Sequence, residues 1–339
     1  MNLNKTEAIW VGCWKFRRKE ISGISWPTGP VKSLGVYFGY NKLSLETNQW
    51  NEKINNIESV LNLWRQRNLT LYGKVTILKS LIAAKILYWA TVSDVPHNVT
   101  VRLNTLFFDF LWSGKRDKIK RSVICGDYGT GGIKMLDIQS HIEALHAGWV
   151  KRIMDTSLGD WKLLPKLYLN RLGKDFLILR MHFKEKKHCP DLTGIPTFYQ
   201  GIIQSWHKAG GGFVKEPCTA DEVGNHIIWG SAFLTDSRGK SLFYKHWIDS
   251  GIIYLKDLSG KEKPKLQNWI KEISELLIIR KAIPKKWLPL LNNNVTSRHD
   301  NTDAHMGPTG YPCKMIYKLL LKEKTTTSYT VCRHIGMLH

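Results

Sequence analysis

The chain has 339 residues, of which 43% are hydrophobic and 11% aromatic, and it contains 14 tryptophans. This composition excludes wholesale disorder, and the length leaves room for two or three domains. Fifty lysines and arginines face 28 acidic residues, which gives a formal net charge of +22. So strong a positive charge favours polyanionic partners, nucleic acid first and an anionic membrane second, although solvated lysines without any partner would give the same composition.

The first 45 residues are expected to be rich in β-structure. Three short apolar runs, Ala8–Val11, Ile24–Trp26 and Leu34–Phe38, are separated by Gly, Pro and Ser. Such spacing is typical of short strands joined by tight turns.

Helical periodicity begins at Trp50. Apolar residues recur on one face as far as Trp64, which predicts an amphipathic helix whose tryptophans belong to a core rather than to a surface that stacks bases. Thr70 is placed to cap a second helix, which is expected to continue through Lys74 to Tyr88. A third helix should follow Pro96, and the three together predict a small helical subdomain.

The rest of the chain is expected to be mixed but mostly helical. Three glycines mark a loop near residue 130, and a further helix from about Asp137 should bury an apolar stripe that runs to Ile153. The segments Ala209–Asn225 and Leu291–Tyr311 have the composition of flexible connections. The predicted fold class is therefore α+β, mainly α.

Two kinds of protein are disfavoured by the sequence. The apolar stretch Val75–Val92 carries Lys79 and Lys85 in its middle, so we do not expect it to span a membrane. The six cysteines lie far apart and form no CxxC pair, so neither a structural zinc site nor a disulfide framework is expected. Free thiols fit an intracellular protein of the cytoplasm or nucleus, not a secreted one.

A group of cations between residues 65 and 85 is the strongest candidate for a binding surface. Its members are Arg65, Arg67, Lys74, Lys79 and Lys85, with Gly73 beside them. Lys74 and Lys85 lie about three helical turns apart and should share a face, while Gly73 would let backbone N–H groups approach a phosphate. These residues could position the successive phosphates of a duplex. A solvated lysine face, with Gly73 serving helix packing, fits the same spacing.

No arrangement of residues predicts catalysis. The sequence contains no adjacent pair of aspartates, and Asp94, Asp109, Asp117 and Asp127 are isolated. Two-metal phosphoryl transfer needs acids that converge on ions about 3.5–4 Å apart. No metal site and no catalytic residue are therefore expected from the motifs.

Six segments, taken in chain order, resemble a known family. They are Asn2–Glu7 (NLNKTE), Val31–Phe38 (VKSLGVYF), Trp64–Lys74 (WRQRNLTLYGK), Phe107–Trp112 (FFDFLW), Gly131–Ile138 (GGIKMLDI) and Phe243–Leu258 (FYKHWIDSGIIYLKDL). In this order they are similar to the end of the palm, the primer grip, the thumb and the post-thumb domain of LINE-type (non-LTR) retrotransposon reverse transcriptases.

The resemblance implies roles for particular residues. Lys5 matches an accessory lysine that the family uses in nucleotide or pyrophosphate handling. Lys32, Leu34 and Gly35 match the K-x-L-G core of the primer grip, although Ser33 replaces the aromatic residue common there. Arg67, Gly73 and Lys74 match conserved positions of the thumb signature. The implied partners are RNA and DNA in a template–primer duplex, together with other retroelement proteins, and no membrane.

The family's Tyr-x-Asp-Asp motif does not occur in the 339 residues. We therefore expect a truncated RNA-directed DNA polymerase that is inactive alone and needs no cofactor of its own, because Mg²⁺ would bind in the missing part of the palm. Its expected parts are a palm remnant with the primer-grip hairpin (1–45), the helical thumb (46–113), a helical connector (114–208), a C-terminal domain (209–290) and a flexible tail (291–339). A non-enzymatic nucleic-acid-binding module kept from a retroelement is the alternative. An enzyme of another class would have to show metal-dependent turnover.

Overall fold

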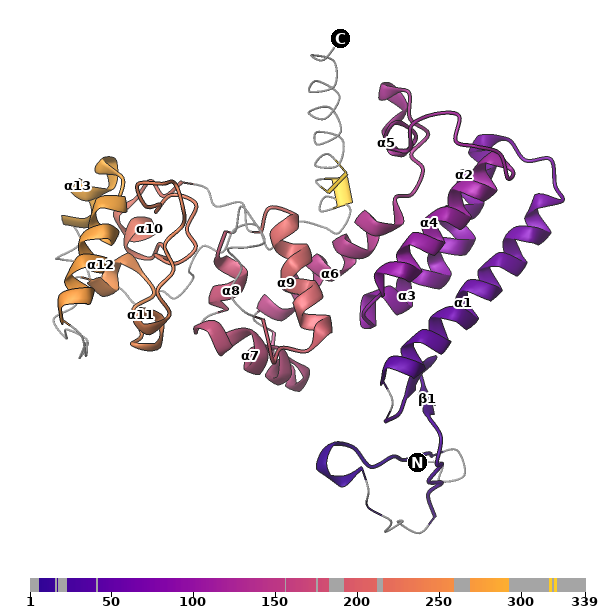
Figure 1. Ribbon diagram of the computed structural model, residues 1–339, viewed down its shortest axis with the longest axis horizontal. Helices are drawn as coiled ribbons and strands as arrows, with labels where there is room; N and C mark the ends of the chain where they lie inside the picture. The colour runs from indigo at the N-terminus through magenta and orange to yellow at the C-terminus, as the bar shows by residue number, and fades with distance from the viewer. Residues whose placement is uncertain are drawn as a thin grey trace. The chain divides into compact units, whose positions relative to one another are not determined.

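The computed structural model describes residues 6–15, 17, 23–40, 42–155, 157–174, 176–182, 192–211, 216–258, 269–292, 317–318 and 320–321. The chain forms two compact units, Met1–Gln139 and Ser140–His339. Both are mainly helical, and the first also contains a two-stranded sheet (Figure 1). The predicted fold class, α+β and mainly α, is confirmed. The division into five parts stays a prediction.

A β-hairpin precedes the first long helix. Strand β1 (Val31–Ser33) pairs antiparallel with β2 (Val36–Phe38). The two residues between them, Leu34 and Gly35, both have positive φ angles, of 50° and 81°. Two positive φ values are the geometry of a type I′ turn, whose twist matches that of the strands it joins. The hairpin expected at Val31–Phe38 is therefore present.

The two other strands expected near the N-terminus are not formed. In their place is a single parallel bridge between Glu7, the residue before the first run, and Ser25 of the second. Trp10 instead stacks on Trp26 with ring centroids 4.8 Å apart. This stacking and two backbone hydrogen bonds, from Ala8 N–H to the Ser25 carbonyl at 2.9 Å and from Ser25 N–H to the Thr6 carbonyl at 3.2 Å, join the segments, and the pairing extends no further.

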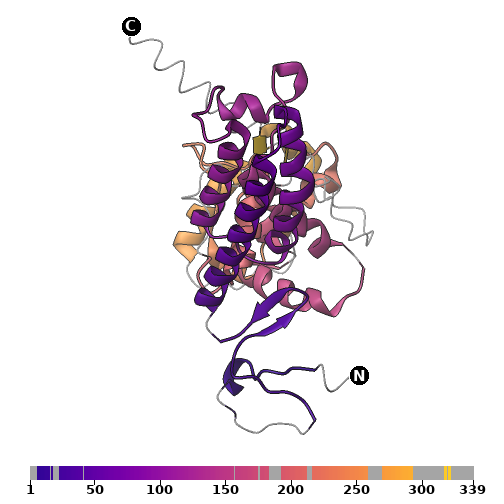
Figure 2. The ribbon, with the colours of Figure 1, turned by 90° about the vertical axis from the view of Figure 1, so that its right-hand side faces the viewer.

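Three helical segments make the body of the first unit. Helix α1 (Lys42–Arg65), the run from α2 to α3, and α4 (His97–Trp112) lie side by side (Figures 1 and 2). Trp50 and Leu61 of α1, Leu78 and Ile82 of the second run and Phe107 of α4 are each at most 1% exposed. The predicted core face of α1 is thus confirmed, although Trp64 at its end is only half-buried. Two shorter elements, α5 (Arg121–Cys125) and η4 (Tyr128–Thr130), follow α4.

The second run is continuous but changes its pitch. It consists of α2 (Leu71–Ile77), a π-helical segment η3 (Leu78–Ala83) and α3 (Ala84–Val92). By length and composition alone Leu71–Val92 could cross a membrane, with a hydropathy of 1.5 and 39% of the window buried. The core helix of a globular protein passes the same test, and the buried residues of this run lie in the core of its unit.

The second unit contains two clusters of buried side chains. The first gathers helices α6 (Ile138–Met154), α7 (Leu163–Leu169), α8 (Leu177–Arg180) and α9 (Thr197–Lys208). The second is built by α10 (Ala220–Gly224), α11 (Lys245–Asp249), α12 (Trp269–Ala282) and α13 (Leu288–Asn292), with short 3-10 turns between them. Leu177 of α8 belongs to the second cluster and Ile178 to the first, so α8 joins the two.

Two sequence expectations in this unit have a definite outcome. The helix expected from about Asp137 is α6, and Ile138, Ile142 and Ile153 are buried as predicted. Within the expected connection Ala209–Asn225 the structure places helix α10, which begins with a capping box between Thr219 and Glu222. The side chains of Thr219 and Glu222 each accept a hydrogen bond from the other residue's backbone N–H, which explains why a helix forms in this polar segment. Most of Leu291–Tyr311 lies outside the described residues.

Candidate nucleic-acid interface

The hairpin places Leu34 and Gly35 at its tip and Lys32 in the middle of β1. Leu34 is 85% exposed and occupies the left-handed region of the turn. Lys32 lies with its Nζ 4.8 Å from the centre of the Tyr37 ring and 3.4 Å from the Tyr37 hydroxyl across the strand pair. Leu34 thus combines a strained backbone with an exposed apolar side chain. The Lys32 cation lies over the ring of Tyr37, its partner on the opposite strand. Lys5 lies outside the described residues.

Two of the predicted cations, Arg65 and Lys74, bind groups at the end of α4. Arg65 at the end of α1 forms an ion pair with Asp109 of α4. Lys74 donates from Nζ to the carbonyl oxygen of Leu111 at 3.2 Å and to the Ser113 hydroxyl at 2.5 Å. The Leu111 carbonyl is one of the four at the end of α4 that have no partner within the helix. Both cations therefore hold the end of α4 in place.

The pKa of Lys74 is affected by its position at this helix end. Partial burial, and after it the nearby charge of Arg65, lowers the pKa of Lys74. The carboxylate of Asp109 and the negative end of the α4 dipole offset the two cations. Lys74 is consequently less available to an external phosphate than a fully exposed lysine.

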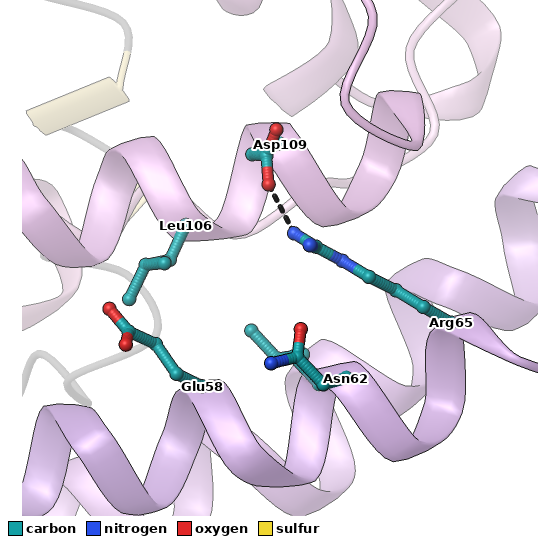
Figure 3. Close-up of a pocket in the computed structure, with 6 residues that line it drawn as sticks. Glu58, Asn62, Arg65, Leu106 and Asp109 are labelled. Carbon is teal, nitrogen blue, oxygen red and sulfur yellow. Dashed lines mark hydrogen bonds and ion pairs between the residues drawn. The ribbon is translucent and has the colours of Figure 1, made fainter.

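A small cleft lies between α1 and α4 beside this ion pair. Its volume is about 190 Å³, and Figure 3 shows Arg65 reaching across it toward Asp109. A second ion pair, between Arg102 and Glu58 at 3.0 Å, joins the same two helices. Because its charged groups already pair with one another, we interpret the cleft as part of the helix interface and not as a ligand site.

Gly73 is not required by packing. A methyl group built there would meet Thr70 Oγ1 at 3.5 Å and a Leu69 carbon at 3.6 Å, which are ordinary contacts. The backbone N–H of Gly73 already donates to the Thr70 hydroxyl at 3.2 Å, so the predicted cap by Thr70 is confirmed. This N–H is therefore already used and does not donate to a phosphate. The space beside Gly73, however, is open to a ligand.

The remaining predicted cations are exposed. Arg67 lies over the Trp64 ring at 4.9 Å, and Lys79 and Lys85 project from the second helical run. Burial, and after it the charge of Lys134, lowers the pKa of Lys79. Because π-helical turns contain more residues than α-helical ones, the segment η3 shifts the register between Lys74 and Lys85 from that of an ideal helix. The structure thus groups Arg65 with Lys74, and Lys79 with Lys134, instead of aligning all of the cations.

A basic segment between α4 and α5 was missed by the sequence reasoning. Residues 115–121 read KRDKIKR, and all seven are exposed. Among the described residues, Lys115, Arg116 and Lys118 form no ion pair, while Arg121 pairs with Asp117 at 2.7 Å. A run of five cations in seven residues was a visible signal, because like charges so closely spaced mark a surface for polyanions.

The same unit also exposes an aromatic pair. Tyr72 of α2 and Tyr128 of η4 have ring centroids 6.1 Å apart and are 58% and 56% exposed. The Nζ of Lys134 lies 4.6 Å above the Tyr128 ring. No sequence pattern indicates this pair, since its members come from different elements. We call Tyr72, Lys79, Tyr128 and Lys134 the tyrosine–lysine patch.

Three of the four aspartates considered as metal ligands pair with cations. Asp109 pairs with Arg65, Asp117 with Arg121, and Asp127 lies 3.5 Å from Lys134. Within the described ranges no three His, Cys, Asp or Glu side chains gather as a metal would require. Cys13, Cys125 and Cys218 are present as thiols.

Comparison with known proteins gives one weak similarity. No family model matches the chain. Over 125 residues it is 26% identical to a protein of Arabidopsis thaliana that carries the provisional name of a ribonuclease H protein. The match covers 34% of this chain, and the chain spans about a fifth of the relative's length (20%).

Proposed function

We propose that this chain binds nucleic acid, as the primer-grip, thumb and post-thumb part of a non-LTR retrotransposon reverse transcriptase. The bound form would be a template–primer duplex of RNA and DNA. The order of the family-like segments supports this assignment. So does the similarity to a relative whose name places it among enzymes that act on RNA.

The exposed basic segment Lys115–Arg121 is the observation that carries the proposal. Three of its cations form no ion pair among the described residues, so no internal partner competes with a phosphate for them. Lys79 is likewise exposed and lies close enough to Lys134 for one charge to lower the other's pKa. Binding of a polyanion stabilises the three unpaired cations of the basic segment, because phosphates relieve their mutual repulsion and condensed counterions are released.

This chain alone is proposed to hold nucleic acid without copying it. DNA synthesis needs converging carboxylates to hold two metal ions, and the sequence contains no adjacent aspartates. In the family the Mg²⁺ ions would bind to the palm, so this chain would contribute affinity and position. The alternative function, a binding module that serves no polymerase, is favoured by the same absence of an aspartate pair. Restored synthesis on mixing with a catalytic palm would distinguish the two.

The proposal is tested by removing the three unpaired charges together. We expect Lys115→Gln, Arg116→Gln and Lys118→Gln in one variant to weaken binding to a 20-base-pair RNA–DNA duplex. The control removes three charges from exposed positions of the other unit, Lys166, Lys174 and Lys245. If both triple variants lose affinity equally, only the net charge matters and the assigned surface is wrong.

A further inference from the structure

The tyrosine–lysine patch has a chemistry that differs from that of a duplex surface. A duplex presents phosphates outward and keeps its base faces stacked inside, so it has little use for exposed aromatic rings. Unpaired bases do expose their faces, and they stack on tyrosine rings while the backbone follows nearby cations. Tyr72 and Tyr128 are more than half exposed, and Lys134 lies against one of the two rings.

The loop that carries Tyr128 and Lys134 is built rigidly. The N–H of Lys134 donates to the Gly126 carbonyl at 3.0 Å, and the N–H of Gly132 donates to the Asp127 carbonyl at 3.0 Å. A side chain at Gly132 would come within 2.2 Å of the Gly126 carbonyl oxygen, so the two strands of the loop touch directly. Tight closure of this kind holds the loop in one conformation before any ligand arrives, which lowers the entropic cost of binding.

Lys134 itself is strained. Its φ angle is 54°, in the left-handed region that glycine occupies at much lower cost. Three neighbouring positions of the loop, Gly129, Gly131 and Gly132, are glycines, yet a lysine occupies this strained position. Strain at a residue whose side chain is exposed points to a role for that side chain.

We propose that the tyrosine–lysine patch binds unpaired nucleotides of a single-stranded RNA or DNA segment. Bases stack on the exposed faces of Tyr72 and Tyr128, and Lys79 and Lys134 contact the phosphates between them. The inference rests on the proposed function and assigns a single-stranded segment to a site other than the duplex-binding basic segment. Tyr88 makes a matched control, since it is 47% exposed on the same helical run and outside the patch.

The test uses the full chain and a 12-nucleotide oligothymidylate with 2-aminopurine at its centre. Stacking quenches 2-aminopurine fluorescence, so quenching on binding is expected with the wild type. The double variant Tyr72→Leu, Tyr128→Leu should lose the quenching and bind about tenfold or more weakly, with the salt dependence unchanged because no charge is removed. Tyr88→Leu should bind like the wild type.

A second variant separates binding from stability. Lys134→Gly should fold at least as well as the wild type, because it relieves the left-handed strain, and should bind oligothymidylate several-fold more weakly with a shallower salt dependence. Equal binding of the double tyrosine variant and of Tyr88→Leu overturns the inference, while the duplex-binding proposal survives. If the wild type binds neither duplex nor single strand at low salt, the proposed function fails and the patch fails with it.

Discussion

The Nζ of Lys74 lies 3.2 Å from the carbonyl oxygen of Leu111, on the last turn of the neighbouring helix α4. A residue that matches a thumb signature is thus used to complete the end of another helix. Two of the three N–H donors of this side chain are used by Leu111 and Ser113, which leaves one for a phosphate. This relationship separates the cations that stabilise the helical body from those that remain available to a ligand.

Replacing Lys74 by Met should destabilise the first unit. The variant keeps the aliphatic stem but leaves the Leu111 carbonyl without its charged donor, which we expect to cost about 1–2 kcal/mol at this half-buried position. Urea denaturation measures the free energy of unfolding, and Lys85→Met, at an exposed lysine, is the control with an expected change below about 0.5 kcal/mol. An unchanged stability of Lys74→Met together with a large loss of duplex affinity would return Lys74 to the binding surface.

Replacing Leu34 by Asn should stabilise the hairpin. Leu34 has a φ of 50° at the first central position of the turn and is followed by Gly35, and Asn–Gly is the preferred pair for this geometry. We expect a gain of about 0.5–1 kcal/mol in the free energy of unfolding, because the strain is relieved. If Leu34 also grips a primer, the same variant will bind template–primer more weakly, so stability and affinity will move in opposite directions. A destabilised Leu34→Asn protein would show that the turn is not type I′.

Replacing Glu275 by Ala should destabilise the second unit strongly. This carboxylate is 6% exposed and accepts hydrogen bonds from Trp247 Nε1 and His246 Nε2, both at 2.7 Å. Its removal leaves the buried indole N–H without an acceptor and opens a cavity, which we expect to cost about 2–4 kcal/mol. Glu216→Ala is the control, because Glu216 pairs with Lys286 at the surface, where such pairs contribute about 0–1 kcal/mol. Equal losses of stability in the two variants would contradict the stabilising role of the buried Glu275 carboxylate.

Stability of the second unit should fall as the pH falls from about 6.5 to 4. Burial lowers the pKa of His207 and of His226 to about 4, against about 6.5 for an unfolded histidine. In this window the unfolded chain binds more protons than the folded one, so the free energy of unfolding decreases with decreasing pH. Each histidine should lower the free energy of unfolding by roughly 2 kcal/mol as the pH falls from about 7.5 to 5.

His207→Gln provides the matched control for this pH effect. The Nε2 of His207 lies 2.8 Å from the Ile178 carbonyl oxygen, which can only accept, so this nitrogen carries the hydrogen. Gln offers a donor that does not titrate. Urea denaturation of the variant should show a flatter dependence on pH, and an unchanged dependence would mean that other groups cause the loss of stability at low pH.

Sequence reasoning succeeded where local signals decide the structure. The apolar period of α1 and the cap at Thr70 depend on residues within a few turns of one another, and both were predictable. The strands expected at Ala8–Val11 and Ile24–Trp26 are reduced to one bridge beside the stacked rings of Trp10 and Trp26, a contact between distant segments that no local pattern reveals.

The candidate site was less predictable than the fold. The cations between Arg65 and Lys85 were found by resemblance and spacing, but the packing of α4 decides that Lys74 is engaged and Lys79 is not. The register shift in η3 depends on tertiary packing as well. The basic segment Lys115–Arg121 could have been found from charge alone, whereas the Tyr72–Tyr128 pair needed the folded chain.

The salt dependence of duplex binding tests most directly whether the basic segment Lys115–Arg121 binds nucleic acid. The dissociation constant of the wild-type chain for a 20-base-pair RNA–DNA duplex would be measured by fluorescence anisotropy between about 50 and 300 mM salt, a range over which phosphate contacts change affinity strongly. A surface touching about 4–6 phosphates predicts that log affinity falls against log salt concentration with a slope of about −4 to −5, and that the Lys115, Arg116 and Lys118 variant loses about three units of slope. Affinity that stays flat across this range would contradict nucleic-acid binding by the basic segment.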